Sequence, residues 1–92
     1  MDTASKSLLG ERRNDVKIMV EILNIAFNET KKTEIVYKAN LNFRQAQKYL
    51  DFLISKGLIA TRVCLHGKSN YQTTQKGKTF AKRYSEIAEL VK

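Results

Sequence analysis

Residues 33–59 decide the fold, and they read TEIVYKANLNFRQAQKYLDFLISKGLI. The first part predicts a short helix over about 33–39. Three apolar side chains share one face of that helix at helical spacing, namely Ile35, Val36 and Ala39. Residues 40–42 then form a tight connection. The segment therefore predicts two helices that meet at a sharp turn.

The second helix is predicted over about 43–56. Asn42 is a good N-cap, Gln45 three residues later completes a capping-box pattern, and Gly57 is the residue expected after the last turn. At 100° per residue the apolar face points to the core. It comprises Phe43, Ala46, Gln47, Leu50, Leu53 and Ile54. The opposite face is polar and basic in its N-terminal half and comprises Arg44, Gln45, Lys48, Phe52 and Ser55.

The flanking segments complete one small domain, since a single domain usually takes about 100–200 residues and this chain has 92. A largely buried helix is expected over about 13–27, followed by a polar turn at 28–32. Strands at 58–65 and 71–73 are expected to form a hairpin around a turn at 66–70. Thr74 is the expected N-cap of a last helix over about 75–91. We divide the chain into a flexible tail (1–12), a folded domain (13–73) and a last helix (74–92).

The formal net charge is +8, and its distribution narrows the choice of partner. Between Glu34 and Glu86 the chain carries ten Lys or Arg residues and one acid, Asp51. Such a segment attracts a polyanion, and nucleic acid is the favoured reading. A solvated basic surface and an anionic membrane surface are the alternatives.

Composition excludes several classes of protein. No apolar run approaches the roughly 18 residues of a membrane span, and the N-terminus lacks an export signal. A single cysteine, Cys64, allows no disulfide framework and fits a reducing interior. Cys64 and His66 are too few for a structural zinc site and lack an orienting group for nucleophilic catalysis. We expect a cytoplasmic, nucleoid-associated protein that is not an enzyme and has no cofactor, metal or small-molecule ligand.

The two predicted helices with a tight turn match the helix-turn-helix pattern, in which the second helix presents its N-terminal residues to base edges in the major groove. Arg44 can reach guanine or phosphate, Gln45 can pair with adenine, and Lys48 suits phosphate. The hairpin tip can touch phosphates or the minor groove, although a polar turn needs no such role. The predicted DNA contacts are Tyr37, Lys38, Asn42, Arg44, Gln45, Lys48, Arg62, His66, Lys68 and Asn70.

The last helix carries an apolar stripe at spacings of 4, 3 and 4, typical of a coiled-coil seam. The stripe comprises Phe80, Tyr84, Ile87 and Val91. It can pack back on the first helix or pair with a second copy of the chain. We predict a homodimer, because the first helix already has enough apolar surface to occupy the other elements.

Three segments carry a resemblance to a known family. They are residues 33–43, residues 49–59 (YLDFLISKGLI) and residues 71–77 (YQTTQKG). With them the chain resembles the archaeal winged helix-turn-helix DNA-binding proteins of about ten kilodaltons. The resemblance implies a mainly α fold with a three-helix core, a wing at 65–71 and dimerisation through a C-terminal coiled-coil helix. It also implies binding of double-stranded DNA by Arg44, Gln45, Lys48 and the wing.

These observations predict a homodimeric transcription regulator that inserts the 43–56 helix into the major groove. Residues 13–73 are then the DNA-binding domain and residues 74–92 the dimerisation helix. A chromatin protein that reads little sequence is one alternative. A winged-helix module that binds other proteins is the other.

Overall fold

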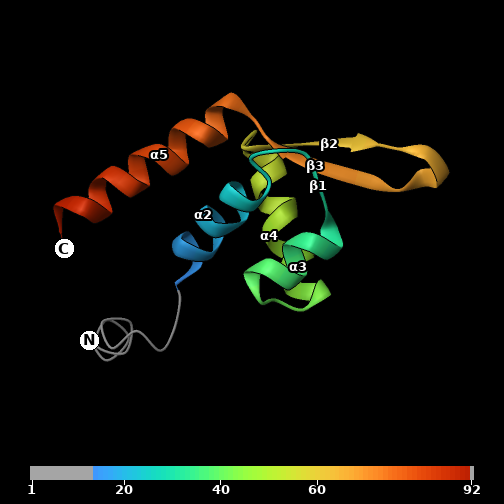
Figure 1. The fold of residues 1–92 in the computed structure, drawn as a ribbon, viewed down its shortest axis with the longest axis horizontal. Helices are drawn as coiled ribbons and strands as arrows, with labels where there is room; N and C mark the ends of the chain where they lie inside the picture. The colour runs from blue at the N-terminus through green and yellow to red at the C-terminus, as the bar shows by residue number, and fades with distance from the viewer. Residues whose placement is uncertain (1–13, 92) are drawn as a thin grey trace.

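The computed structural model describes residues 14–91, so the predicted tail at 1–12 lies outside the described residues. The elements follow the predicted order, with one strand that the sequence did not predict (Figure 1). They are α2 (Asp15–Ile25), β1 (Thr30–Lys31), α3 (Lys32–Ala39), α4 (Phe43–Ser55), β2 (Ile59–Val63), the 3₁₀ turn η1 (Leu65–Gly67), β3 (Ser69–Thr73) and α5 (Gln75–Leu90).

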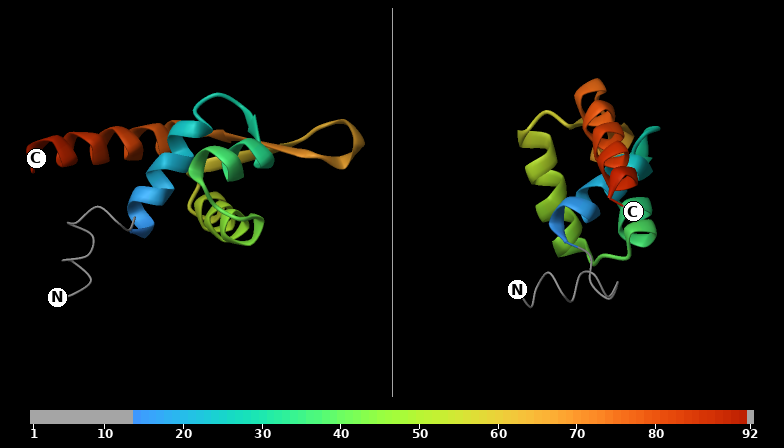
Figure 2. Two further views of the ribbon diagram at one scale, coloured as in Figure 1. Left: turned by 60° about the horizontal axis from the view of Figure 1, so that its bottom comes forward. Right: turned by 90° about the vertical axis from the view of Figure 1, so that its left-hand side faces the viewer.

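The core lies where α2, α3 and α4 meet the inner end of the sheet. Viewed along the molecule, α2 lies between α3 and α4 (Figure 2). The large side chains with almost no exposed surface are Ile22, Leu23, Ile35, Leu50, Leu53 and Ile59. They come from α2, α3, α4 and β2, so four elements are held by one apolar cluster.

The sheet is antiparallel, with the strand order β1-β3-β2. Thr73, at the end of β3, ties the sheet to α2. Its hydroxyl donates to the Leu23 carbonyl at 2.6 Å and its N–H donates to the Ala26 carbonyl at 2.8 Å. The hairpin of β2 and β3 extends from this anchor away from the helices, in the direction opposite to α5 (Figure 1).

The prediction of a polar turn at 28–32 was wrong in its second half. Thr30 and Lys31 form β1, which pairs with Tyr71 and Asn70 of β3. Lys32 already belongs to α3. A two-residue strand is too short for an alternating pattern, so only its pairing with β3 defines it. The hairpin strands also differ from prediction, because β2 ends at Val63 and β3 begins at Ser69.

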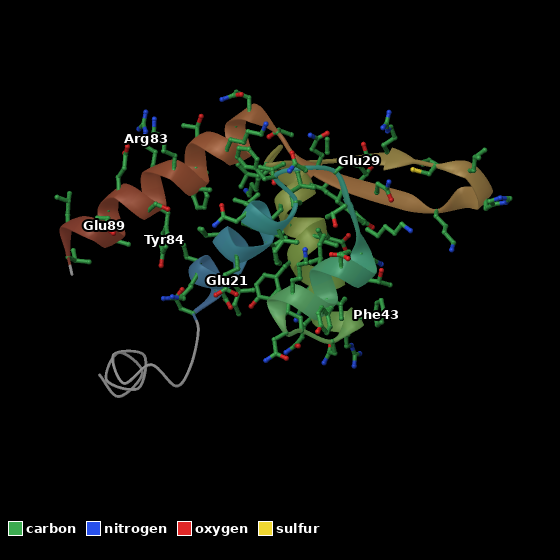
Figure 3. The ribbon with its side chains drawn as sticks, viewed as in Figure 1. Glu21, Glu29, Phe43, Arg83, Tyr84 and Glu89 are labelled. Carbon is green, nitrogen blue, oxygen red and sulfur yellow. The ribbon has the colours of Figure 1, made fainter. Side chains whose placement is uncertain are left out.

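The caps of α4 follow the sequence, but its predicted core face does not hold at the first residue. The side chain of Asn42 caps the helix, and Gly57 after it has a φ of +74°. Phe43 was predicted to face the core, yet 55% of it is exposed. Phe43 is the first residue of α4, and Figure 3 shows it on the side of α3 and α4 that is turned away from α2, so it lies beyond the core.

Helix α5 begins against the sheet and then leaves the body of the protein (Figure 1). Thr74 caps it, as predicted, by accepting from the N–H of Gly77. Gly77 and Ala81 are buried, whereas Ile87 near the other end is 60% exposed. No helix within residues 14–91 is long and apolar enough to cross a membrane.

Candidate nucleic-acid interface

The outward face of α4 presents Arg44, Gln45 and Lys48 to solvent, as the sequence predicted. A complete capping box holds the first turn that carries them. Asn42 Oδ1 accepts from the Gln45 N–H at 2.7 Å, and the Asn42 N–H donates to Gln45 Oε1 at 3.0 Å. Asn42 therefore positions the helix start. The contact to adenine predicted for Gln45 would use the same side-chain amide oxygen. Because that oxygen can accept two hydrogen bonds, the cap leaves it able to accept one from the base.

A chain of side-chain hydrogen bonds connects the two helices of the helix-turn-helix. The Lys32 ammonium of α3 donates to Gln47 Oε1 of α4. Gln47 Nε2 in turn donates to Asp51 Oδ1 at 2.7 Å. These bonds link the start of α3 to the middle of α4, so polar contacts as well as the apolar core join the two helices.

Two of the predicted DNA contacts, Tyr37 and Lys38, lie on α3, and only Lys38 carries a charge. Tyr37 is almost fully exposed, so its hydroxyl can reach a partner. The Lys38 ammonium lies 3.1 Å from a Glu34 carboxylate oxygen, which compensates part of its charge. An exposed pair at this spacing is weak and exchanges readily for another anion.

The hairpin of β2, η1 and β3 is the wing. His66 and Gly67 at its tip both have positive φ, of +66° and +74°, and this allows a tight reversal. His66 and Lys68 are exposed there, as predicted. Asn70 was predicted at the tip, but it lies inside β3, half-buried, between Arg62 of β2 and Lys31 of β1. The reversal is made by residues 65–68, so residue 70 is already paired.

Glu29 joins the two strands of the wing near their outer ends, at the Arg62–Asn70 pair (Figure 3). One carboxylate oxygen accepts from Arg62 Nη2 at 2.7 Å, and the other accepts from Asn70 Nδ2 at 2.8 Å. The hydrogen bond from Asn70 is the main cause of a lowered pKa of Glu29, and the hydrogen bond from Arg62 is the next. The bond to Glu29 in turn raises the pKa of Arg62. Two of the predicted DNA contacts are thus engaged in holding the wing to the residue that precedes β1.

A hollow between the wing and the start of α3 gathers three lysines, Lys31, Lys32 and Lys68. The first two were not among the predicted contacts, because they lie outside the basic segment counted from Glu34 onward. Their signal in the sequence is a pair of lysines just before the helix-turn-helix. Strand β1 brings these two lysines beside the wing, so the basic surface extends from the wing to the start of α3.

The predicted apolar stripe of α5 splits into two parts. Tyr84 is half-buried and packs against the chain's own core, and Figure 3 shows it on the side of α5 that faces α2. Ile87 and Val91 project free of the body with 60% and 77% exposure. Phe80 is about one third exposed. Leu90, which the sequence did not single out, is more exposed than Ile87 or Val91. Within residues 14–91 no three His, Cys, Asp or Glu side chains lie together as a metal site requires.

The core of α2, α3 and α4, the sharp turn between α3 and α4, and the hairpin beside them define the winged helix-turn-helix class. The chain belongs to the winged helix-turn-helix family, whose profile matches residues 12–92. The family resemblance and the fold class that the sequence predicted are therefore confirmed.

Similar proteins come from archaea and bacteria. An uncharacterized protein of Methanocaldococcus jannaschii is 40% identical over 80 residues, which cover 86% of this chain and 74% of that protein. A second uncharacterized protein of that organism is 29% identical over 91 residues, and the chain spans 41% of its length.

Among solved structures, Sso10a-2, a DNA-binding protein from Sulfolobus solfataricus, aligns with a TM-score of 0.79 and 29% identity over 85% of this chain and 81% of that one. MepR, a transcription regulator of the Staphylococcus aureus multidrug efflux pump MepA, aligns with a TM-score of 0.72 and 15% identity over 95% of this chain and 65% of that one. The second likeness shows the fold alone.

Proposed function

We propose that this protein is a DNA-binding transcription regulator that acts as a homodimer on double-stranded DNA. Helix α4 enters the major groove, and the wing lies on the backbone or in the minor groove. The family supports the class of protein, and Sso10a-2, similar over most of both chains, is described as DNA-binding. Binding is the whole of the proposed activity, and no catalytic step is part of it.

One observation carries the proposal: the helix-turn-helix presents cations both on the polar face of α4 and in the lysine hollow between the start of α3 and the wing. Arg44 and Lys48 stand exposed on α4, whose first turn is held rigid by the capping box. Lys31 and Lys68 stand exposed beside the wing. A duplex carries one negative charge per about 1.7 Å of its axis, so it can engage both groups of cations together.

The dimer is proposed through the free end of α5. Ile87, Leu90 and Val91 are large apolar side chains with no cover from the body of the chain. A second copy of α5 would bury them. In this proposal residues 13–73 bind DNA, residues 74–92 join the copies, and the protein is a nucleoid-associated component of the cytoplasm.

The test is duplex affinity as a function of salt concentration. Arg44→Ala and Lys48→Ala should each weaken binding and reduce the slope of log K against log salt by about one. Arg83→Ala is the matched control, because Arg83 is exposed on α5 and points away from α2 (Figure 3). If the α4 variants bind like the parent while melting alike, the assignment of the recognition face is wrong.

Two alternatives are separated by the same measurements. A chromatin protein would bind unrelated duplexes with nearly equal affinity, whereas a regulator should prefer its operator by about 10³-fold or more. A module that binds only proteins would shift no duplex at about 50 mM salt.

A further inference from the structure

The outer part of the wing carries two large, mostly exposed apolar side chains, Leu65 in the turn and Val63 at the end of β2 behind it. Leu65 is 83% exposed and Val63 is 71% exposed. Both lie outside the α5 surface that the proposed dimer would bury. A leucine at a turn gains nothing from that exposure, because its side chain contributes to stability mainly when it leaves water.

Leu65 stands at the start of the turn that reverses the chain. Leu65 is the first residue of η1, and the chain reverses over the next two residues. The Cys64 N–H donates to the Lys68 carbonyl, which closes the hairpin immediately behind the reversal. Leu65 therefore belongs to the turn at the outer end of the wing, and Figure 1 shows that this end of the hairpin lies far from the helices.

The strands of the wing are held more firmly than those of a two-stranded hairpin would be. Strand β1 adds a third strand next to β3, and Glu29 holds Arg62 of β2 and Asn70 of β3 through separate oxygens. A hairpin anchored in this way can press its tip against a partner instead of folding back.

Lysines lie beside the apolar side chain of Leu65 in one hollow. Lys68 directly follows the reversal, and Leu65 lines the same hollow as Lys31 and Lys68. The partner that fits is a polyanion with an apolar interior that a single side chain can reach. A DNA duplex meets this description, because its phosphates are outside and its stacked bases inside. Leucine is among the residues that proteins insert between base steps from the minor groove.

We propose that Leu65 is a wedge that enters the minor groove, partly unstacks a base step and bends the duplex, so that the protein shapes DNA as well as binding it. This inference rests on the proposed function. Lys31 and Lys68 would attract the phosphate backbone of the DNA toward the wing. The hydrogen bonds of Glu29 would keep the wing in place against the elastic force of the bent DNA.

The experiment is ligase-catalysed ring closure of linear duplexes of about 100 base pairs, which lie below the persistence length of about 150 base pairs and rarely close unaided. It needs no knowledge of the operator. The full-length protein should raise the yield of circles by about tenfold, because a fixed bend replaces curvature that must otherwise arise thermally. Leu65→Ser should lose this effect and keep its duplex affinity within about threefold, since phosphate contacts dominate affinity.

Val63→Thr is the matched control, because it changes an exposed side chain of the same wing behind the tip with little change in volume. It should close circles like the parent. A second readout is 2-aminopurine placed in the duplex, whose fluorescence should rise with the parent and the Val63 variant but not with Leu65→Ser. Both substitutions are at exposed positions, so melting temperatures should stay close to that of the parent.

The inference is overturned if Leu65→Ser closes circles as well as the parent, or if the parent binds duplex without raising ring closure. In either case the proposed DNA binding would stand. If the parent protein does not bind duplex DNA at all, both the wedge and the proposed function are overturned. Sedimentation with phosphatidylglycerol vesicles that depends on Leu65, with ring closure unaffected by Leu65→Ser, would overturn the wedge in favour of a membrane contact.

Discussion

Gly77→Ala tests how α5 is joined to the rest of the protein, because two physical effects predict opposite signs. In a helix, alanine is more stable than glycine by up to about 1 kcal/mol. At this position, however, an added Cβ would lie 2.2 Å from the Leu58 carbonyl oxygen and 2.6 Å from Thr73 Cγ2. Ordinary carbon–oxygen contacts lie at about 3.3 Å or more, so the backbone must move by about 1 Å.

That movement is costly because the Leu58 oxygen is already bonded. It accepts from the Thr74 N–H at 3.0 Å, directly at the start of α5. Overpacking of a well-filled site costs about 1–3 kcal/mol. A Cβ 2.2 Å from a backbone oxygen belongs in the upper part of that range, about 2–3 kcal/mol, so after the gain in helix propensity of about 1 kcal/mol the expected net loss is about 1–2 kcal/mol. For a chain of this size each 1 kcal/mol lowers the melting temperature by about 4–8 °C, so a fall of about 5–15 °C is expected.

The assay is thermal unfolding followed by circular dichroism, with Ser85→Ala as the control. Ser85 is exposed in the middle of α5, so this change gains helix propensity without a clash. It should raise the melting temperature slightly. A melting temperature of Gly77→Ala equal to or above that of the parent would refute the close packing of α5 on the sheet.

Three further predictions concern the cap, the clamp and the seam. Asn42→Ala should lower stability in urea by about 1 kcal/mol and weaken duplex binding, whereas Asn42→Asp should keep the stability; an unchanged Asn42→Ala variant would contradict the capping role. The pKa of Glu29 is lowered below its ordinary value of 4.5 in the folded protein, so its stabilisation is present above pH 4.5 and is lost as the pH falls through the lowered pKa. Glu29→Gln should therefore flatten the dependence of melting temperature on pH in this acid range, and identical pH profiles would count against the clamp. Ile87→Asp should convert a dimer into monomers in sedimentation at micromolar concentration, and a monomeric parent would refute the seam.

Local signals predicted the helix-turn-helix almost to the residue. The cap of α4 needs only Asn42 and Gln45, three residues apart, and the end of the helix needs only Gly57. The cap of α5 by Thr74 is equally local. The same reasoning failed for Phe43, because the helical angle says which way a side chain points and not whether the core extends that far.

The candidate site was predicted in part. The exposure of Arg44, Gln45 and Lys48 followed from the helical pattern, since polar residues opposite an apolar face stay in water. Lys31 and Lys32 were missed, because nothing near them in the sequence places them beside Lys68. The assignment of Asn70 to the wing tip was wrong by a few residues, because the exact length of a tight turn depends on how the strands pair.

The sequence by itself determined the family, the two helices of the DNA-reading motif and the excess of positive charge. Each of these depends on residue types or on neighbours within about one helical turn. Only the tertiary structure decided the third strand, the clamp of Glu29 on Arg62 and Asn70, and the division of α5 into a packed half and a free half. Glu29 lies 33 and 41 residues before its two partners. Contacts at that separation exist only after the core has closed and aligned the strands, because packing and not local preference sets their geometry.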